Sequence, residues 1–135
     1  MDLSVVANDE RVARLELARK LRERADHSSE QELRDALSRS YYSLYHAARV
    51  LIAREKGGLG HDKLREEVQT IDSELAATLK DLYRLRENAD YNPEMVAQLY
   101  AGDMERFREG AEEALQRGSD AYRQIQALIS AKQGE

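Results

Sequence analysis

The most constraining stretch of this sequence is residues 37–53, which contain no glycine or proline and carry apolar side chains at helical spacing. With about 3.6 residues per turn, positions three and four apart fall on one face of a helix. Five residues share this face: Tyr41, Leu44, Ala48, Leu51 and Ile52. The stretch therefore predicts a helix that is buried along one side, and other elements of the chain must cover that side.

A second stripe on the same predicted helix is polar. Arg39, Tyr42, His46 and Arg49 follow spacings of three, four and three residues, so they share one face. A helix that only packs a core does not need long cationic and aromatic groups beside its apolar stripe. We interpret Arg39, Tyr42 and Arg49 as a candidate phosphate-binding site, because arginine suits planar, bidentate recognition of phosphate or carboxylate.

The composition indicates a single all-α domain. A chain of 135 residues has the size of one domain and is long enough to bury a core. One proline, seven glycines and 35% charged residues, with periodic apolar positions, favour helices over strands. Cysteine is absent, which excludes disulfides and thiolate metal sites. We expect an up-and-down bundle of four main helices plus a short additional helix.

Capping residues and glycines predict where these helices begin and end. Residues 1–8 are expected to form a loosely held arm, and residues 9–135 one domain. Three glycines within residues 57–60 end the second helix. The predicted helices cover residues 9–26, 30–56, 61–91 (one helix, or two with a tight joint near 71–73), 94–100 and 104–132.

Charge and hydropathy narrow the function classes. The formal charge of −5 argues against a protein that binds nucleic acid through a broadly basic surface, but it is compatible with a local cationic pocket. No apolar run approaches the roughly 18 residues of a membrane span, and the N-terminus lacks a signal pattern. We expect a cytoplasmic protein that does not associate with membranes. No His, Asp and Glu set has metal-ligand spacing, so no metal or other cofactor is predicted.

A second polar cluster lies at the predicted end of a helix, in residues 83–93. Arg86, Asp90 and Tyr91 fall within about a turn and a half, and Asn92-Pro93 then reverses the chain. Such a cluster is well placed to face a groove. We include all three residues in the candidate nucleotide or phosphate site.

Taken together, the two clusters resemble a known family. The pattern Ser-Arg-x-Tyr-Tyr-x-x-Tyr-His-Ala-Ala-Arg, a histidine that opens the next helix, and a later Arg-x-x-Ala-Asp-Tyr are similar to HEPN domains ("higher eukaryotes and prokaryotes nucleotide-binding"). The resemblance covers roughly residues 10–130. It implies a bundle of four main helices plus a short fifth, usually a homodimer. It also implies frequent pairing with a minimal nucleotidyltransferase, in toxin–antitoxin-like modules.

The resemblance also suggests two chemistries. Many HEPN proteins are metal-independent endoribonucleases whose Arg-x(4–6)-His motif holds the scissile phosphate and moves a proton. Here Tyr91 stands where that histidine is expected, five positions after Arg86, so the chain is closer to the Arg-x-x-Ala-Asp-Tyr branch. In related toxin pairs the partner transferase adds nucleotides to a tyrosine near this motif, which makes Tyr91 the candidate acceptor.

Several alternatives stay open from the residues alone. Arg39 and His46 also fit an Arg-x(6)-His spacing, about 10.5 Å apart along one helix face. An active ribonuclease could thus use Arg86 or Arg39 with His46 as its catalytic pair. His46 could instead be a packed histidine, and Arg39 could form a buried bridge to Asp90. His61 is a further candidate for lining the groove. The third hypothesis is a structural four-helix adaptor without a ligand.

Overall fold

The computed structural model describes residue 13, residues 29–52 and residues 60–133. Within these residues the chain forms five helices and no strand, which confirms the predicted all-α class. The helices are α2 (Ser29–Ile52), α3 (His61–Gln69), α4 (Ser73–Tyr91), α5 (Met95–Tyr100) and α6 (Met104–Gln133). The predicted arm, nearly all of the predicted first helix, and the glycine-rich loop lie outside the described residues. Ala13 alone represents the first helix; it is helical and buried.

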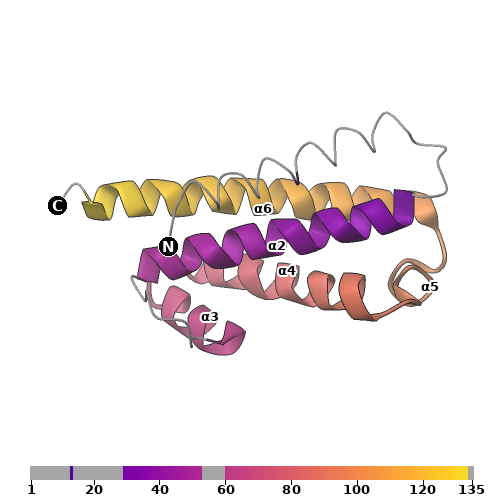
Figure 1. Ribbon diagram of the computed structural model, residues 1–135, viewed down its shortest axis with the longest axis horizontal. Helices are drawn as coiled ribbons and strands as arrows, with labels where there is room; N and C mark the ends of the chain where they lie inside the picture. The colour runs from indigo at the N-terminus through magenta and orange to yellow at the C-terminus, as the bar shows by residue number, and fades with distance from the viewer. Residues whose placement is uncertain (1–12, 14–28, 53–59, 134–135) are drawn as a thin grey trace.

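Three long helices lie side by side and form the body of the bundle (Figure 1). The chain colours show that α4 runs antiparallel to both α2 and α6. Helix α3 packs on α4 and α2 near the end of α2, and the short α5 lies at the opposite end, between α4 and α6. The bundle arrangement is therefore as predicted. Its core includes Tyr41, Leu44, Ala48 and Leu51 of the predicted apolar stripe, while Ile52 is half-buried.

The joint between α3 and α4 resolves the alternative over residues 61–91 in favour of two helices. Asp72 is the N-cap of α4, and its carboxylate accepts a hydrogen bond from the Leu75 amide at 3.0 Å. Ile71 lies in this joint and is exposed. The break rotates the chain, so Ile71 does not share the buried face of Leu64, Val68 and Leu75.

The other boundaries also follow local chemistry. Helix α4 ends at Tyr91, because Asn92 precedes Pro93 and adopts an extended conformation. Between α5 and α6, Ala101 and Gly102 both have positive φ, 54° and 74°, and reverse the chain. Asp103 then caps α6, since its carboxylate accepts hydrogen bonds from two amides of the first turn.

Candidate functional site

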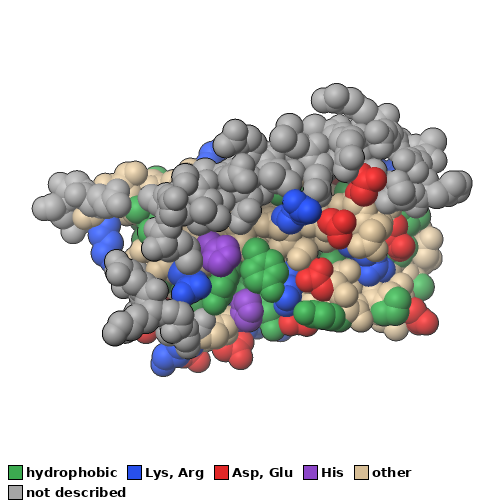
Figure 2. All heavy atoms as spheres, in the orientation of Figure 1, with side chains coloured by type: hydrophobic (Ala, Val, Ile, Leu, Met, Phe, Trp, Pro, Cys, Tyr) green, Lys and Arg blue, Asp and Glu red, His purple; other side chains and the backbone are tan. Residues whose placement is uncertain are grey.

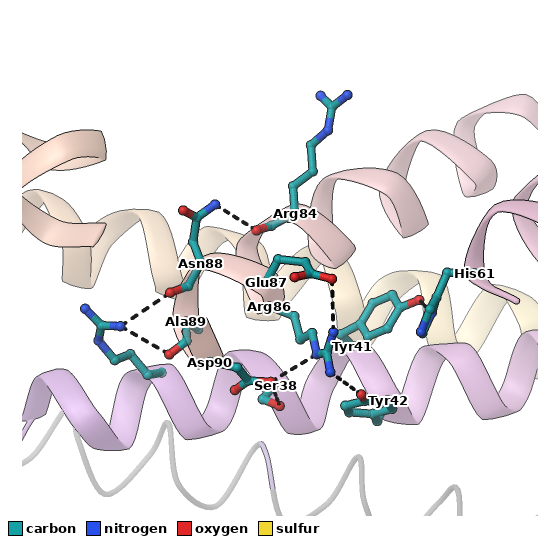
Figure 3. A network of polar contacts seen from close by, with 11 residues as sticks. Ser38, Tyr41, Tyr42, His61, Arg84, Arg86, Glu87, Asn88, Ala89 and Asp90 are labelled. Carbon is teal, nitrogen blue, oxygen red and sulfur yellow. Dashed lines mark hydrogen bonds and ion pairs between the residues drawn. The ribbon is translucent and has the colours of Figure 1, made fainter. Parts of the chain in front are cut away.

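The candidate site is centred on the guanidinium group of Arg86, on the α4 face that packs against α2 (Figure 3). The Arg86 residue is only 8% exposed. Its Nη2 donates to the hydroxyl of Tyr42 from α2, and its Nε lies 3.0 Å from Asp90 Oδ2 as an ion pair. Its Nη1 lies 3.4 Å from Glu87 Oε1. A buried cation requires such partners, because desolvation without them is costly.

Two helices cooperate to hold this group in place. Arg86 and Asp90 are four residues apart, so they lie one above the other on α4. From α2, Ser38 donates to Asp90 Oδ2 at 3.1 Å, and the Tyr42 ring lies 4.9 Å from the Arg86 guanidinium carbon. Burial alone would lower the pKa of Arg86, but Tyr42 and Asp90 outweigh it and raise that pKa. Arg86 is therefore a permanently charged link between α2 and α4.

Tyr91 is the exposed member of this cluster. It is the last residue of α4, and 69% of its surface is accessible. Its ring lies 5.4 Å from the Arg86 guanidinium carbon, within the range of a cation–π contact. A hollow of about 350 Å³ borders it, between the start of α2 and the end of α4. Its lining includes Glu30, Arg34, Asp90, Tyr91 and Pro93.

An aromatic cluster continues from Arg86 toward the start of α3. Tyr41, buried to 1% exposure, contacts the imidazole of His61 through its hydroxyl. The His61 ring also lies 4.8 Å from the Tyr45 ring and 4.7 Å from the Tyr83 ring, measured between centroids. Figure 2 shows histidine side chains beside hydrophobic and basic ones on this face of the molecule. Histidine, phenols and cations thus share one partly exposed surface.

The surroundings shift two of these groups toward their neutral forms. Burial raises the pKa of Tyr41 well above its ordinary value, so its hydroxyl stays protonated. Burial, followed by the positive charges of Arg86 and Arg65, lowers the pKa of His61. These surroundings favour the neutral imidazole of His61 over the imidazolium. A neutral histidine beside cations can donate or accept one hydrogen bond at each ring nitrogen, depending on its tautomer.

The structure brings most of the predicted site residues together. Tyr42 contacts Arg86 directly, and its ring lies 6.4 Å from the ring of His46. Arg49 lies over the ring of Tyr45, with its guanidinium carbon 5.6 Å from the ring centroid. The part of the predicted α2 stripe that begins at Tyr42 therefore lies on one face of the helix, and this face adjoins the Arg86 cluster of α4.

Arg39 does not share this environment. Its side chain is exposed, so the predicted alternative of a buried bridge from Arg39 to Asp90 is wrong. The buried arginine that pairs with Asp90 is Arg86, in the same helix. The error has a simple cause: helical spacing places Arg39 on the stripe, but the rotation of α2 against α4 decides how much of the stripe is covered.

Sequence reasoning missed Arg34, which is buried at the start of α2. Its guanidinium donates to the carbonyl oxygens of Ala89 at 3.1 Å, Asn92 at 2.8 Å and Pro93 at 3.2 Å. It thus supplies donors to carbonyls at the end of α4 and just beyond it, where the positive charge also complements the negative end of the helix. One signal was available, because Arg34 lies between Leu33 and Leu37 on the predicted apolar side, where an arginine needs buried partners.

Neither metal nor membrane chemistry is indicated by the described part of the chain. Among residues 29–52 and 60–133, no three His, Asp or Glu side chains are grouped closely enough to hold a metal ion. None of the helices described above combines the length and the apolar character that crossing a bilayer requires.

Comparison of the chain with protein-family models, with curated proteins and with solved structures returned no match. The function therefore has to be inferred from the site itself.

Proposed function

We propose that this protein is a HEPN-like module with a nucleotide-linked role, which works with a minimal nucleotidyltransferase and accepts a nucleotide on Tyr91. The proposal includes a homodimer and a toxin–antitoxin-like setting, as the sequence resemblance implies. Arg86, Tyr42, Arg49 and Asp90 form or support the nucleotide and phosphate site around that tyrosine.

One observation carries the proposal: Tyr91 is exposed while Arg86, which its ring contacts, is buried and held in place. An acceptor for a transferase must be reachable from outside, and a phenol that is 69% exposed at a helix end meets that requirement. A guanidinium fixed beside it supplies positive charge where a transferred phosphate carries negative charge. The Glu87 contact, at 3.4 Å, is the weakest of the Arg86 contacts and the one a phosphate would replace most readily.

The chemistry is transfer of a nucleoside monophosphate from a nucleoside triphosphate bound by the partner enzyme. The phenolic oxygen of Tyr91 forms a bond to the α-phosphorus, and the bond from that phosphorus to the β-phosphate oxygen breaks. Pyrophosphate leaves, and the phenolic proton passes to a base on the transferase or to water. This chain needs to supply only an accessible hydroxyl and its charged surroundings.

The test is transfer of labelled nucleotide to this chain by a minimal nucleotidyltransferase. The purified protein is incubated with the enzyme, Mg²⁺ and each radiolabelled nucleoside triphosphate, and the labelled peptide is identified by mass spectrometry. We expect label on Tyr91 and none in Tyr91→Phe. Tyr100→Phe is the matched control, since Tyr100 is a less exposed tyrosine in the neighbouring helix α5 and should leave labelling unchanged. Label that persists in Tyr91→Phe would contradict the proposal.

A second candidate function is metal-independent endoribonuclease activity. It is favoured by the contact of both Arg86 and His46 with the Tyr42 ring, from two different helices. In that reaction His46 would move a proton of the attacking 2′-hydroxyl or the leaving 5′-oxygen, and Arg86 would hold the phosphate.

RNA cleavage without added metal tests this second function. Loss of cleavage in both Arg86→Ala and His46→Ala, with helical content retained and with Arg84→Ala still active, would establish the nuclease. A wild-type protein that neither cleaves RNA nor accepts a nucleotide would leave the structural adaptor as the remaining hypothesis.

A further inference from the structure

The contact between Tyr41 and His61 is not used by the proposed function, yet it determines the state of an accessible histidine. The hydroxyl of Tyr41 meets His61 Nδ1 in the interior of the aromatic cluster (Figure 3). Within the described residues this is the one hydrogen bond of the Tyr41 hydroxyl. A buried hydroxyl places its proton on an acceptor, because a buried donor without a partner loses its hydrogen bonds to water and gains none in return.

The position of that proton defines the tautomer of His61. The Tyr41 hydroxyl is protonated, and donation to His61 Nδ1 is the arrangement that gives its buried proton an acceptor. Nδ1 is then the acceptor nitrogen, and the imidazole proton resides on Nε2. Protonation of Nδ1 would turn this nitrogen into a donor, so the Tyr41 hydroxyl would lose the acceptor of its own proton.

Nε2 is the open edge of this imidazole. Within residues 29–52 and 60–133 it has no hydrogen-bond partner, and it does not belong to the polar atoms that are buried without one. The rings of Tyr45 and Tyr83 approach His61 from α2 and α4. The Nε2–H group is therefore a donor presented to solvent between aromatic side chains.

The positive charges that act on His61 outweigh the negative charges that act on it. Arg49 lies over the ring of Tyr45 and makes no ion pair with the described residues. The guanidinium carbon of Arg65 lies 5.2 Å from the centroid of the Tyr83 ring, and Arg65 pairs with Asp62. The remaining charged groups that act on His61 are Arg86 and Glu87 of α4, which pair with each other. An N–H donor in surroundings where positive charges outweigh negative ones suits an anionic acceptor.

We propose that Tyr41 holds His61 as a neutral Nε2–H donor, and that this donor, with Arg49 and the Tyr45 and Tyr83 rings, binds a phosphate oxygen of a nucleotide. The neutral, fixed imidazole makes His61 a binding residue that donates a hydrogen bond, and it rules out His61 as a proton acceptor at Nδ1. The choice of a nucleotide as ligand rests on the proposed function, whereas the tautomer does not.

The tautomer is measured by NMR of protein labelled with ¹⁵N-histidine, with the His61 signals assigned through His61→Gln. We expect the Nε2–H pattern at pH 7 and a pKa of His61 below its ordinary value. Tyr41→Phe should mix the tautomers and raise that pKa, whereas Tyr100→Phe, in α5 at the far end of the bundle, should change neither. A Nδ1–H pattern, or an unchanged pattern in Tyr41→Phe, would overturn the proposal.

The ligand is tested by titrating the same sample with adenosine monophosphate, inorganic phosphate and adenosine. We expect the His61 ring signals to shift with both phosphates and much less with adenosine, and the affinity for the nucleotide to fall about tenfold in His61→Ala. Tyr41→Phe, which keeps His61, should reduce affinity less. Absence of a His61 shift at millimolar nucleotide would overturn the ligand assignment. Failure of Tyr91 labelling with these shifts intact would refute only the proposed function.

Discussion

At the scale of single residues, two buried arginines show how identical side chains take different roles. Arg34 donates to backbone carbonyls at the end of α4, so its charge complements the negative end of that helix. Arg86 instead pairs with carboxylates and a phenol, so it links side chains from two helices. Arg86 also contacts the exposed aromatic ring of Tyr91, and this contact separates a candidate site from a helix cap.

Replacing Arg86 tests how much this link contributes to stability. Arg86→Ala removes a buried donor from Tyr42 and leaves Asp90 without its cation, so we expect the free energy of unfolding to fall by about 2 kcal/mol. Urea denaturation followed by circular dichroism measures the change. Arg84→Ala is the control, because Arg84 is exposed on the same helix and should change stability by less than about 0.5 kcal/mol. Equal effects of the two variants would show that the Arg86 contacts contribute nothing specific.

The lowered pKa of His61 predicts a pH dependence of stability. The folded protein binds its proton less readily than the unfolded chain, so the unfolded state takes up more protons as the pH falls below the ordinary histidine pKa. Stability is therefore fully present above about pH 7 and is lost as the pH falls toward the lowered pKa of His61. Urea midpoints measured from pH 7.5 to 5.5 should decrease in the wild type and decrease less in His61→Gln. Parallel profiles for the two proteins would contradict this assignment.

At the scale of helices, the crossing of α2 and α6 depends on two small residues. A methyl group added at Gly118 would lie 2.5 Å from Ser40 Oγ and 3.3 Å from Leu82 Cδ1. Glycine at this position therefore allows close packing of the two longest described helices. It has a local cost, because glycine within a helix is about 1 kcal/mol less favourable than alanine.

A double-mutant cycle separates these two effects. We expect Gly118→Ala to lower the free energy of unfolding by about 1 kcal/mol, because the clash exceeds the gain in helix propensity. Adding Ser40→Ala removes the clashing oxygen and should restore stability to at least the level of Ser40→Ala alone, as measured by urea denaturation. Strict additivity of the two substitutions would show that α2 and α6 do not meet at this pair.

At the scale of the whole molecule, the net charge of −5 is unfavourable to nucleic acid, so any RNA binding must come from a local cluster. Two or three arginines near the aromatic cluster correspond to two or three phosphates. We therefore expect the logarithm of the binding constant for single-stranded RNA to fall with the logarithm of salt concentration, with a slope between about −1.4 and about −2.1. Fluorescence anisotropy between about 50 and 200 mM salt measures this slope.

The control for this measurement is Arg123→Ala, which removes an exposed cation of α6 and should leave both affinity and slope unchanged. A slope of about −5 would indicate an extended basic surface and would argue against a compact site. Arg49→Ala should reduce the magnitude of this slope by about 0.7 if Arg49 contacts one phosphate.

Much of the fold was predictable from sequence, because its determinants are local. Helical spacing located the covered face of α2, Asp72 and Pro93 marked helix ends through capping and backbone restriction, and Gly102 marked the turn before α6. Half of the candidate site was predictable for the same reason. Tyr42, His46 and Arg49 share a face of α2 whatever the helix packs against.

The tertiary structure alone decided which side chains meet across helices. Arg86 meets Tyr42 from 44 positions away in the chain, and His61 meets Tyr41 from 20 positions away. Spacing within one helix cannot supply these pairs, since they depend on the rotation and register of one helix against another. The same rotation leaves Arg39 exposed, buries Arg34 over the end of α4, and turns Tyr91 outward. Sequence thus determined the helices and the groups they carry, and packing determined which of those groups form a site.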